Sequence, residues 1–167
     1  MRGPMVHRRS RTPSRSTMTY SKRVWSAAPL PKGYPLPVGP YTPAVHAGSF
    51  VFVSGQTPRD PVTGETGKED IQVQSRRTLF NLKAVLSAAG ATLDDVVSVT
   101  VYLANEEDWG AFNEVYQEFF KEPYPTRTAI GCSLRGILVE VSAIAMVVPF
   151  TGSPTPSKGF RSDMTLY

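Results

Sequence analysis

The segment 137–146 constrains the fold of this chain more than any other, because its side chains alternate as they do in a half-buried β-strand. The odd-numbered positions are all apolar, whereas the even-numbered positions include one acid, Glu140, between Val139 and Val141. Burying a carboxylate in such a strand is costly without a partner. Glu140 is therefore a candidate general base, and a solvent-facing place on an edge strand is the alternative.

Four further strands and two helices are predicted from the same kind of periodicity. A hairpin is expected over 44–54, one strand over 95–104 and a short strand over 127–133. The first helix should begin after an N-cap at Asp70 and close at Gly90. Its apolar stripe consists of Leu79, Leu82, Leu86 and Ala89.

The second helix is predicted to follow a cap at Asn105, which places the three acids 106–108 near the positive end of the helix dipole. Pro123 and Pro125 should end it. Its apolar face consists of Trp109, Phe112, Tyr116 and Phe119, and the predicted core includes Leu79, Leu82, Trp109 and Phe119.

The predicted element order is β-β-α-β-α-β-β, which indicates an α+β fold. Packing both helices on one face of a mixed sheet is the economical arrangement. It leaves the other face of the sheet bare, and no remaining segment of the chain is suited to cover it. Self-association is therefore expected.

The net charge of +4 is a property of the N-terminal tail. Seven of the 18 basic residues lie in residues 1–23, so residues 24–167 carry 11 basic against 14 acidic residues, a net charge of −3. A nucleic-acid surface on the folded part is therefore not expected. Because Cys132 is the single cysteine, no disulfide forms within the chain, which suits a reducing compartment. We expect a cytoplasmic protein without a membrane span or signal peptide.

Three regions are predicted along the chain. Residues 1–23, rich in Arg and Ser, should be disordered. They have three competing explanations: an upstream start codon with Met18 as the true beginning, a transit peptide that would direct the protein to mitochondria, or a polyanion-binding tail. One domain should occupy 24–149, opening with the proline-rich, extended lead-in 24–43, and 150–167 should form a loose extension.

Arg127 stands in the run Pro125-Thr126-Arg127-Thr128-Ala129, after a loop broken by proline and at the start of an apolar segment. A guanidinium placed there can grip a small carboxylate through two parallel hydrogen bonds. The alternative is an ordinary surface arginine on a strand edge. The setting of Arg127 and the acid in the following strand favour an organic-acid pocket.

Seven motifs between about Pro37 and Val148 resemble, in order and at nearly the same spacing, those of the RidA-type (YjgF) family of reactive-intermediate deaminases. They are GPY at 39–41, FVSGQ at 52–56, DPVTGE at 60–65, NLKAVL with AAG within 81–90, FNEVY with FF within 112–120, PTRTA at 125–129 and VEVSAIA at 139–145.

This resemblance implies a chorismate-mutase-like fold assembled as a homotrimer, with three clefts between subunits. It implies hydrolysis of 2-imino acids such as 2-iminobutanoate and 2-iminopropanoate, or their enamine tautomers, to 2-oxo acids and ammonia. Such imines leak from pyridoxal-phosphate dehydratases that act on serine and threonine. No cofactor is implied. Some family members have been described as translation inhibitors or ribonucleases.

The candidate site residues follow from both lines of reasoning. Arg127 would hold the substrate carboxylate and Glu140 would orient a water toward the imine carbon. Asn113 could bond to the substrate, and a plain helix-surface position is its alternative. Tyr41, Ser54 and Gly55 are expected to line the cleft, Gly55 through its backbone. Structural roles are expected for His46 and Cys132, without a metal site.

Two departures from the family pattern bear on the site. The family often has Cys two residues after the arginine, where this chain has Ala129, whose backbone N–H is then the expected contact. The loop 133–136 is shorter than in the family, which leaves the substrate preference open.

Three rival functions remain. A non-catalytic metabolite sensor would use the same arginine, so the sequence does not separate it from an enzyme. An RNA-acting protein would need a basic face on the folded part. A chorismate mutase would need a second basic cluster beside Arg127, and the neighbouring sequence shows none.

Overall fold

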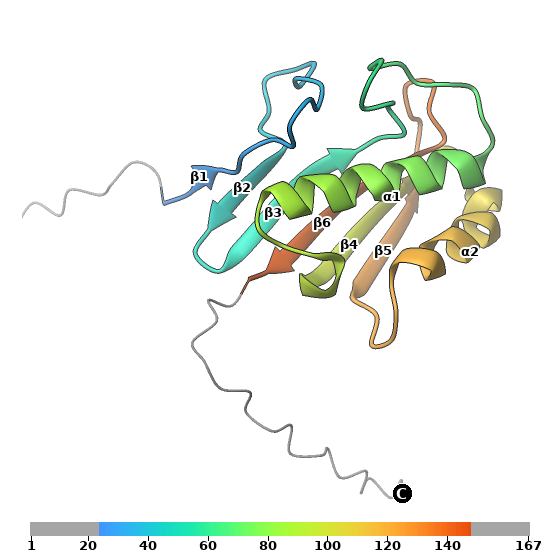
Figure 1. Ribbon diagram of the computed structural model, residues 1–167. Coiled ribbons are helices and arrows are strands. Elements are labelled where there is room, and N and C mark those ends of the chain that lie inside the picture. The colour runs from blue at the N-terminus through green and yellow to red at the C-terminus, as the bar shows by residue number, and fades with distance from the viewer. Residues whose placement is uncertain (1–23, 148–167) are drawn as a thin grey trace, which may run out of the picture.

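A computed structural model describes residues 24–147, shown in Figure 1. The predictions for 1–23 and 150–167 lie outside these residues. The strands are β1 Ser26–Ala27, β2 Ala44–Ala47, β3 Phe50–Gln56, β4 Val96–Leu103, β5 Thr126–Gly131 and β6 Val139–Met146. The helices are α1 Ile71–Ala88 and α2 Trp109–Phe119, with short 3₁₀ turns η1 Leu93–Asp95 and η2 Glu106–Asp108. The predicted order is confirmed, with a two-residue strand, β1, added inside the lead-in.

The strands form one mixed sheet in the order β1-β2-β3-β6-β4-β5. The strand with the single acid, β6, pairs antiparallel with both β3 and β4. By contrast, β5 pairs parallel with β4. The connection through α2 returns the chain to the end of the sheet where β4 begins, so β5 runs in the same direction as β4. This parallel edge strand carries Arg127.

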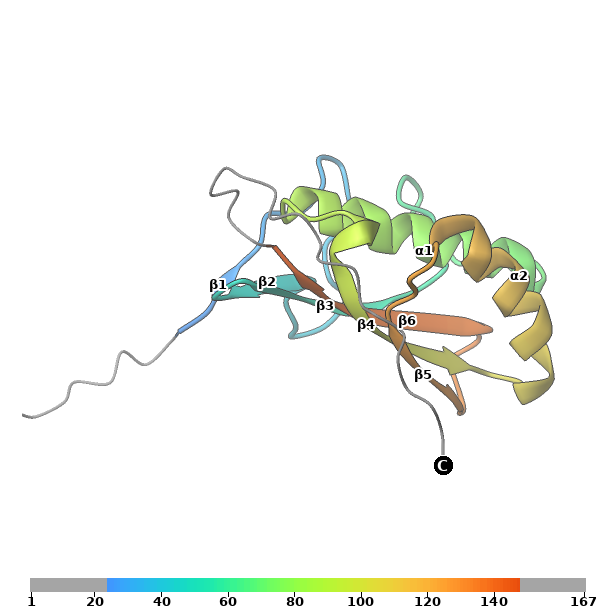
Figure 2. The same ribbon diagram turned by 90° about the horizontal axis from the view of Figure 1, so that it is seen from below.

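Both helices cover the same face of the sheet, as Figure 2 shows and as predicted. The alternation in β6 decides what lies beneath them: Val139, Val141, Ala143 and Ala145 are buried against the helical layer. The predicted stripe residues Leu79, Leu82 and Leu86 of α1, and Ala89 at its C-cap, are also buried. The apolar core between helices and sheet is thus the one that the periodicities indicate.

The first helix begins and ends where its caps predict. Asp70 Oδ1 accepts a hydrogen bond from the backbone N–H of Val73 at 2.9 Å, which satisfies one of the free donors of the first turn. Gly90 follows the last turn at φ +75°, a conformation that favours glycine.

The start of the second helix differs from the prediction. The acids after Asn105 form the separate 3₁₀ turn η2, in which the Asp108 N–H bonds to the Asn105 carbonyl at 3.2 Å, and α2 begins only at Trp109. Trp109 was predicted to lie in the core, and this is wrong, because its side chain is 44% exposed. Phe119 is partly buried against the core, as expected.

The second face of the sheet carries no covering layer within residues 24–147 (Figure 2). Large apolar side chains are exposed on its strands, among them Phe50, Phe52, Ile130 and Met146. Over the same residues, neither helix has the length and apolar character that crossing a bilayer requires.

Candidate functional site

Arg127 lies on the helical side of the sheet. It is the register partner of Val99, which is buried beneath the helices, so the two side chains share a face. Its guanidinium carbon lies 5.0 Å from the ring centroid of Trp109 and 4.7 Å from that of Tyr116. Both distances suit cation–π contacts, which hold the guanidinium in place without using its N–H donors. No ion pair joins Arg127 to a carboxylate of residues 24–147.

An open hollow of about 280 Å³ adjoins this arginine, and its walls are Asn113, Tyr116, Gln117, Tyr124, Pro125 and Arg127. Two of its polar atoms, Asn113 Oδ1 and the Tyr116 hydroxyl, are buried and lack a partner within the described residues. Burial raises the pKa of Tyr116 to about 12, so its phenol stays protonated and can donate a hydrogen bond. We call this set of residues the Arg127 hollow, and it is suited to a small carboxylate.

Glu140 lies on the opposite face of the sheet. Its register partner in β4 is Tyr102, and both side chains face away from the buried core. A hollow of about 290 Å³ is lined by Gly55, Tyr102, Leu134, Glu140 and Ser142, and we call it the Glu140 hollow. Burial raises the pKa of Glu140, because a carboxylate loses solvation when it is partly withdrawn from water. A raised pKa makes this carboxylate a stronger base than an ordinary glutamate.

Gly55 makes the position of Glu140 possible. A Cβ built on Gly55 would overlap the Glu140 carboxylate, so any larger residue would push the acid away. The sequence predicts that Gly55 matters because another group approaches its backbone closely, and in the structure that group is the Glu140 side chain.

The predicted site residues therefore fall into three groups within one chain, two of which contain Arg127 and Glu140. Asn113 and Ala129 accompany Arg127, because Ala129 follows it by two positions on the same face of β5. Gly55 accompanies Glu140. The structure of one chain does not bring Arg127 and Glu140 into a shared cleft, so a site that uses both requires a second chain.

Tyr41 and Ser54 line a third hollow together, on the side of β2 and β3. Tyr41 is exposed, whereas the Ser54 hydroxyl donates to the carbonyl of Thr42 at 2.7 Å. The proton of Ser54 is thus engaged inside the chain, and its oxygen remains available only as an acceptor.

Sequence reasoning missed the aromatic support of Arg127. Trp109 and Tyr116 were read as one apolar helix face, yet their rings hold the guanidinium. The available signal was their spacing of seven residues, which puts two rings on one face of a helix that leads into the arginine strand.

His46 and Cys132 take no part in either hollow. His46 lies in β2 between its strand partners Ser26 and Val51. The backbone N–H of Cys132 donates to the Leu103 carbonyl at 2.9 Å, next to the β4–β5 pairing. Residues 24–147 contain no group of three or more His, Cys, Asp or Glu placed to hold a metal ion.

Comparisons with known proteins agree with this fold. The model of the family described as endoribonuclease L-PSP matches residues 32–147. A RutC family protein of Pyrococcus horikoshii is 50% identical over 113 residues, which cover 66% of this chain and 90% of that protein. The 2-iminobutanoate/2-iminopropanoate deaminase of Dermatophagoides farinae is 36% identical over 115 residues, 68% of this chain and 90% of the relative.

Among solved structures, that of Escherichia coli TdcF with bound serine superposes with a TM-score of 0.68 at 37% identity, covering 74% of this chain and 98% of TdcF. The shared architecture is an α+β layer of two helices on a mixed sheet. The chain belongs to the RidA (YjgF) family, whose model carries the endoribonuclease L-PSP description. Relatives named as deaminases support reactive-intermediate deamination as the general class of activity.

Proposed function

We propose that this protein hydrolyses reactive 2-imino acids, such as 2-iminobutanoate and 2-iminopropanoate, to 2-oxo acids and ammonia. The observation that carries the proposal is Arg127, a guanidinium held between two aromatic rings, free of a carboxylate partner within residues 24–147, and open to a hollow. The bound serine of TdcF supports it, because an amino acid carries the carboxylate that such an arginine would hold.

We further propose that the site forms between protomers of a homotrimer. Arg127 and Glu140 face opposite sides of one sheet, and the face that carries Glu140 exposes apolar side chains that a second chain would cover. In a closed ring, the Arg127 hollow of each protomer meets the Glu140 hollow of the next protomer. Every site then contains both residues. That the ring contains three protomers is taken from the family resemblance.

The proposed reaction needs positioning and proton transfer. Arg127 binds the substrate carboxylate and fixes the imine carbon near the neighbouring protomer's Glu140 carboxylate. Glu140 takes a proton from a water as its oxygen bonds to that carbon, which gives a carbinolamine. Because the imine reacts in its protonated form, the carbinolamine is neutral, and the same proton then passes to its nitrogen. As the C–N bond breaks, the hydroxyl group loses its proton to the departing ammonia, and ammonium and the 2-oxo acid leave. General acid–base help of this kind contributes roughly 10²–10⁴-fold.

A dehydratase-coupled assay tests the proposal. Threonine dehydratase generates 2-iminobutanoate in the presence of semicarbazide, which traps imine that has not been hydrolysed, and added protein should divert the flux to free 2-oxobutanoate. Arg127→Ala should lose nearly all of this effect, whereas Lys83→Ala, which removes an exposed cation from α1, should keep it. Full activity in a folded Arg127→Ala protein would refute the carboxylate clamp. Binding of imine analogues without turnover would indicate a sensor.

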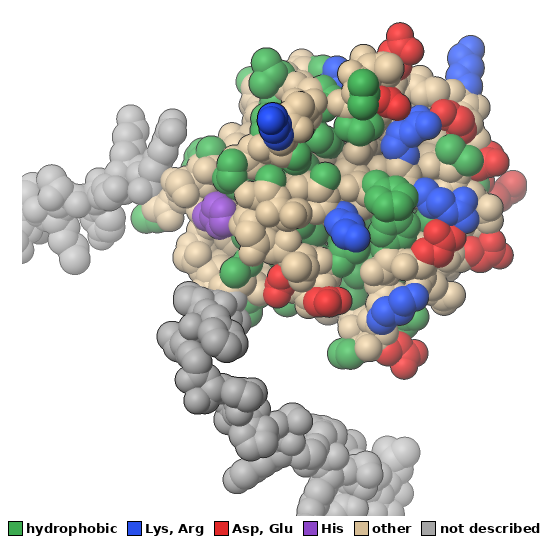
Figure 3. Space-filling view, in the orientation of Figure 1, with side chains coloured by type: hydrophobic (Ala, Val, Ile, Leu, Met, Phe, Trp, Pro, Cys, Tyr) green, Lys and Arg blue, Asp and Glu red, His purple; other side chains and the backbone are tan. Residues whose placement is uncertain are grey.

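The family description also names an endoribonuclease, and RNA is therefore a second candidate. Lys, Arg, Asp and Glu side chains are interspersed over the helical face in Figure 3, and Arg76 and Arg77 pair with Glu118 and Glu69. Such a face offers RNA no continuous basic surface. Filter binding of RNA to residues 24–167, if it persisted and weakened steeply with salt, would favour this candidate.

A further inference from the structure

A larger hollow, of about 590 Å³, adjoins the Glu140 hollow and shares Leu134 and Glu140 with it. Its walls come from the loop between β3 and α1 and from the loop between β5 and β6. Both loops lie at the end of the sheet where β6 begins, as Figure 1 shows. Two cations, Arg59 and Arg135, belong to these walls. A substrate that reaches Glu140 therefore lies at the entrance to a cationic space.

Pairing divides the arginines of residues 24–147 into two sets. Arg76 and Arg77 form ion pairs with carboxylates. Arg59, Arg127 and Arg135 form none with the described residues, and each of them lines a hollow. Burial raises the pKa of Glu140, and no cation lowers it. Arg59 and Arg135 therefore do not pair with Glu140 and can interact with a ligand instead.

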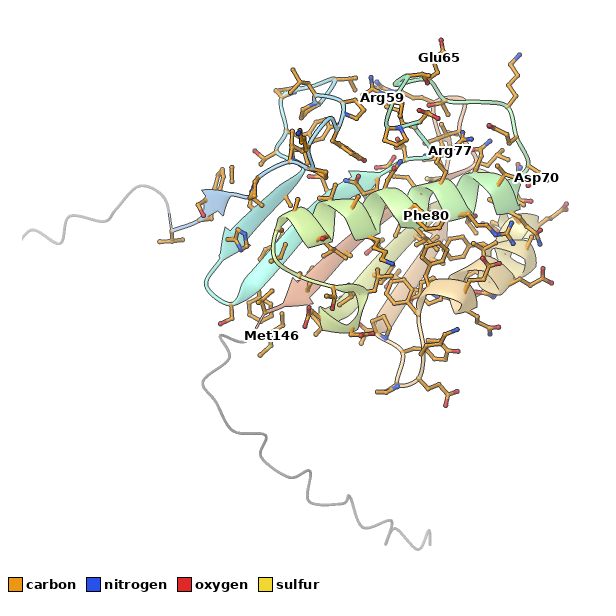
Figure 4. The ribbon with its side chains drawn as sticks, in the orientation of Figure 1. Arg59, Glu65, Asp70, Arg77, Phe80 and Met146 are labelled. Atoms are coloured by element: carbon orange, nitrogen blue, oxygen red, sulfur yellow. The ribbon has the colours of Figure 1, made fainter. Side chains whose placement is uncertain are left out.

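Arg59 is held in place before any ligand arrives. Its Nε donates to the carbonyl of Gly64 at 2.6 Å, across the turn that carries Arg59 and Glu65 in Figure 4. The carbonyl of Arg59 accepts from Asn81 Nδ2 of α1 at 2.8 Å. Its Nη2 forms no hydrogen bond with the described residues, so a fixed donor remains available. A preorganised guanidinium binds an anion with little further loss of entropy.

Arg135 lies in the short loop that departs from the family pattern. Gly136, at φ +76°, closes a tight turn through its N–H bond to the Leu134 carbonyl at 2.8 Å. Leu134 of this turn lines both hollows together with Glu140, and Arg135 lies on the wall of the larger hollow. Arg135 is exposed and forms no ion pair with the rest of residues 24–147.

The chemistry of this space fits a second carboxylate. An ethyl side chain, as in 2-iminobutanoate, would leave both guanidinium groups without an anionic partner. A carboxylate there would accept charge-assisted hydrogen bonds, which are about twice as strong as neutral ones. Thr57, Thr66 and Ser133 add hydroxyl groups to the same walls.

We infer that Arg59 and Arg135 make this protein selective for 2-imino acids with a second carboxylate on the side chain, such as 2-iminoglutarate. The inference rests on the proposed function and names its substrate class. Water adds to the imine carbon, the C–N bond breaks, and a 2-oxo dicarboxylate and ammonia are released, as in the reaction above.

The test compares two imines with the full-length chain. Amino-acid oxidases generate 2-iminoglutarate from glutamate and 2-iminobutanoate from 2-aminobutanoate, with catalase to remove peroxide and semicarbazide to trap free imine. Wild type should hydrolyse 2-iminoglutarate about tenfold or more efficiently than 2-iminobutanoate, the size expected for a hydrogen bond to a charged group. Arg135→Gln and Arg59→Gln should each remove most of that preference and leave 2-iminobutanoate hydrolysis within about twofold.

Lys83→Gln is the matched control, since it removes an exposed cation outside both hollows, and it should keep the preference. Melting temperatures check Arg59→Gln, because Arg59 also bonds to the Gly64 carbonyl, whereas the side chain of Arg135 forms no hydrogen bond with residues 24–147. Equal efficiency of wild type on the two imines, or variants that lower both rates alike, would overturn the inference and leave the proposed function standing. A wild-type protein inactive on both imines would overturn both.

Discussion

The carboxylate of Glu140 lies against the backbone of Gly55, in the space that a Cβ would occupy. Gly55 sits between Val53 and Gln56, where the pairing of β3 with β6 changes register, so β3 bends beside the acid. The strand irregularity and the missing side chain together make room for a half-buried carboxylate. The position of the proposed base thus depends on a residue in a different strand.

Gly55→Ala should displace Glu140 and lower the rate of imine hydrolysis by roughly 10²-fold, the effect expected from moving a catalytic group by about 1 Å. Gly110→Ala is the matched control, because a Cβ on Gly110 of α2 meets no atom within 4 Å. The coupled assay measures both variants. Unchanged activity in Gly55→Ala would contradict a catalytic role for Glu140 in the observed position.

Trp109→Ala should weaken substrate binding more than it affects folding, because Trp109 lies outside the buried core and its ring packs on Arg127. An exposed cation–π contact contributes about 0.5–1 kcal/mol, so KM should rise a few-fold while the melting temperature changes little. Trp109→Phe keeps an aromatic face and should recover most of the loss. If Trp109→Phe behaved like Trp109→Ala, the contribution of the ring would not be a cation–π contact.

Burial raises the pKa of Glu140, and this sets the direction of two pH effects. As a base, Glu140 must be ionised, so activity should fall as the pH falls through its raised pKa. The folded state binds this proton more tightly than the unfolded state does. Stability from Glu140 is therefore present below the unfolded pKa and is lost as the pH rises through the folded pKa.

Glu140→Gln isolates this effect, because Gln resembles the protonated acid. The melting temperature of Glu140→Gln relative to wild type should rise from pH 4 to pH 7. Because the variant lacks the base, it should also be inactive over this pH range. A constant difference in melting temperature over this range would show that Glu140 titrates as an ordinary exposed carboxyl group.

Mixing two inactive variants tests whether the site lies between protomers. Chains with Arg127→Ala and chains with Glu140→Gln should each be inactive alone. A random mixture, assembled by co-refolding, should regain up to about a quarter of wild-type activity, because a site is complete where the two intact residues of neighbouring chains meet. Arg127→Ala chains mixed with chains carrying both substitutions form the control and should stay inactive. A mixture as inactive as this control would contradict a site that Arg127 and Glu140 of neighbouring protomers share.

Much of the fold could be read from the residues themselves. The alternation in 137–146, the stripe that follows Asp70 and the glycine at position 90 each specify a local structure through backbone geometry and short-range burial. The start of α2 could not be predicted in this way. Asn105 has the chemistry of an α-helix cap, but the turn after it closed as 3₁₀, and Trp109 became the first residue of the helix.

The sequence by itself determined which residues are the candidates for the chemistry, because a lone acid in an apolar strand and an arginine after a broken loop stand out against their neighbours. Only the tertiary structure decided how they are arranged. Strand register sends Arg127 to the helical face and Glu140 to the other, and the meeting of two loops brings Arg59 and Arg135 to one hollow. These relationships depend on pairing between segments far apart along the chain, which the local periodicity of side chains does not encode.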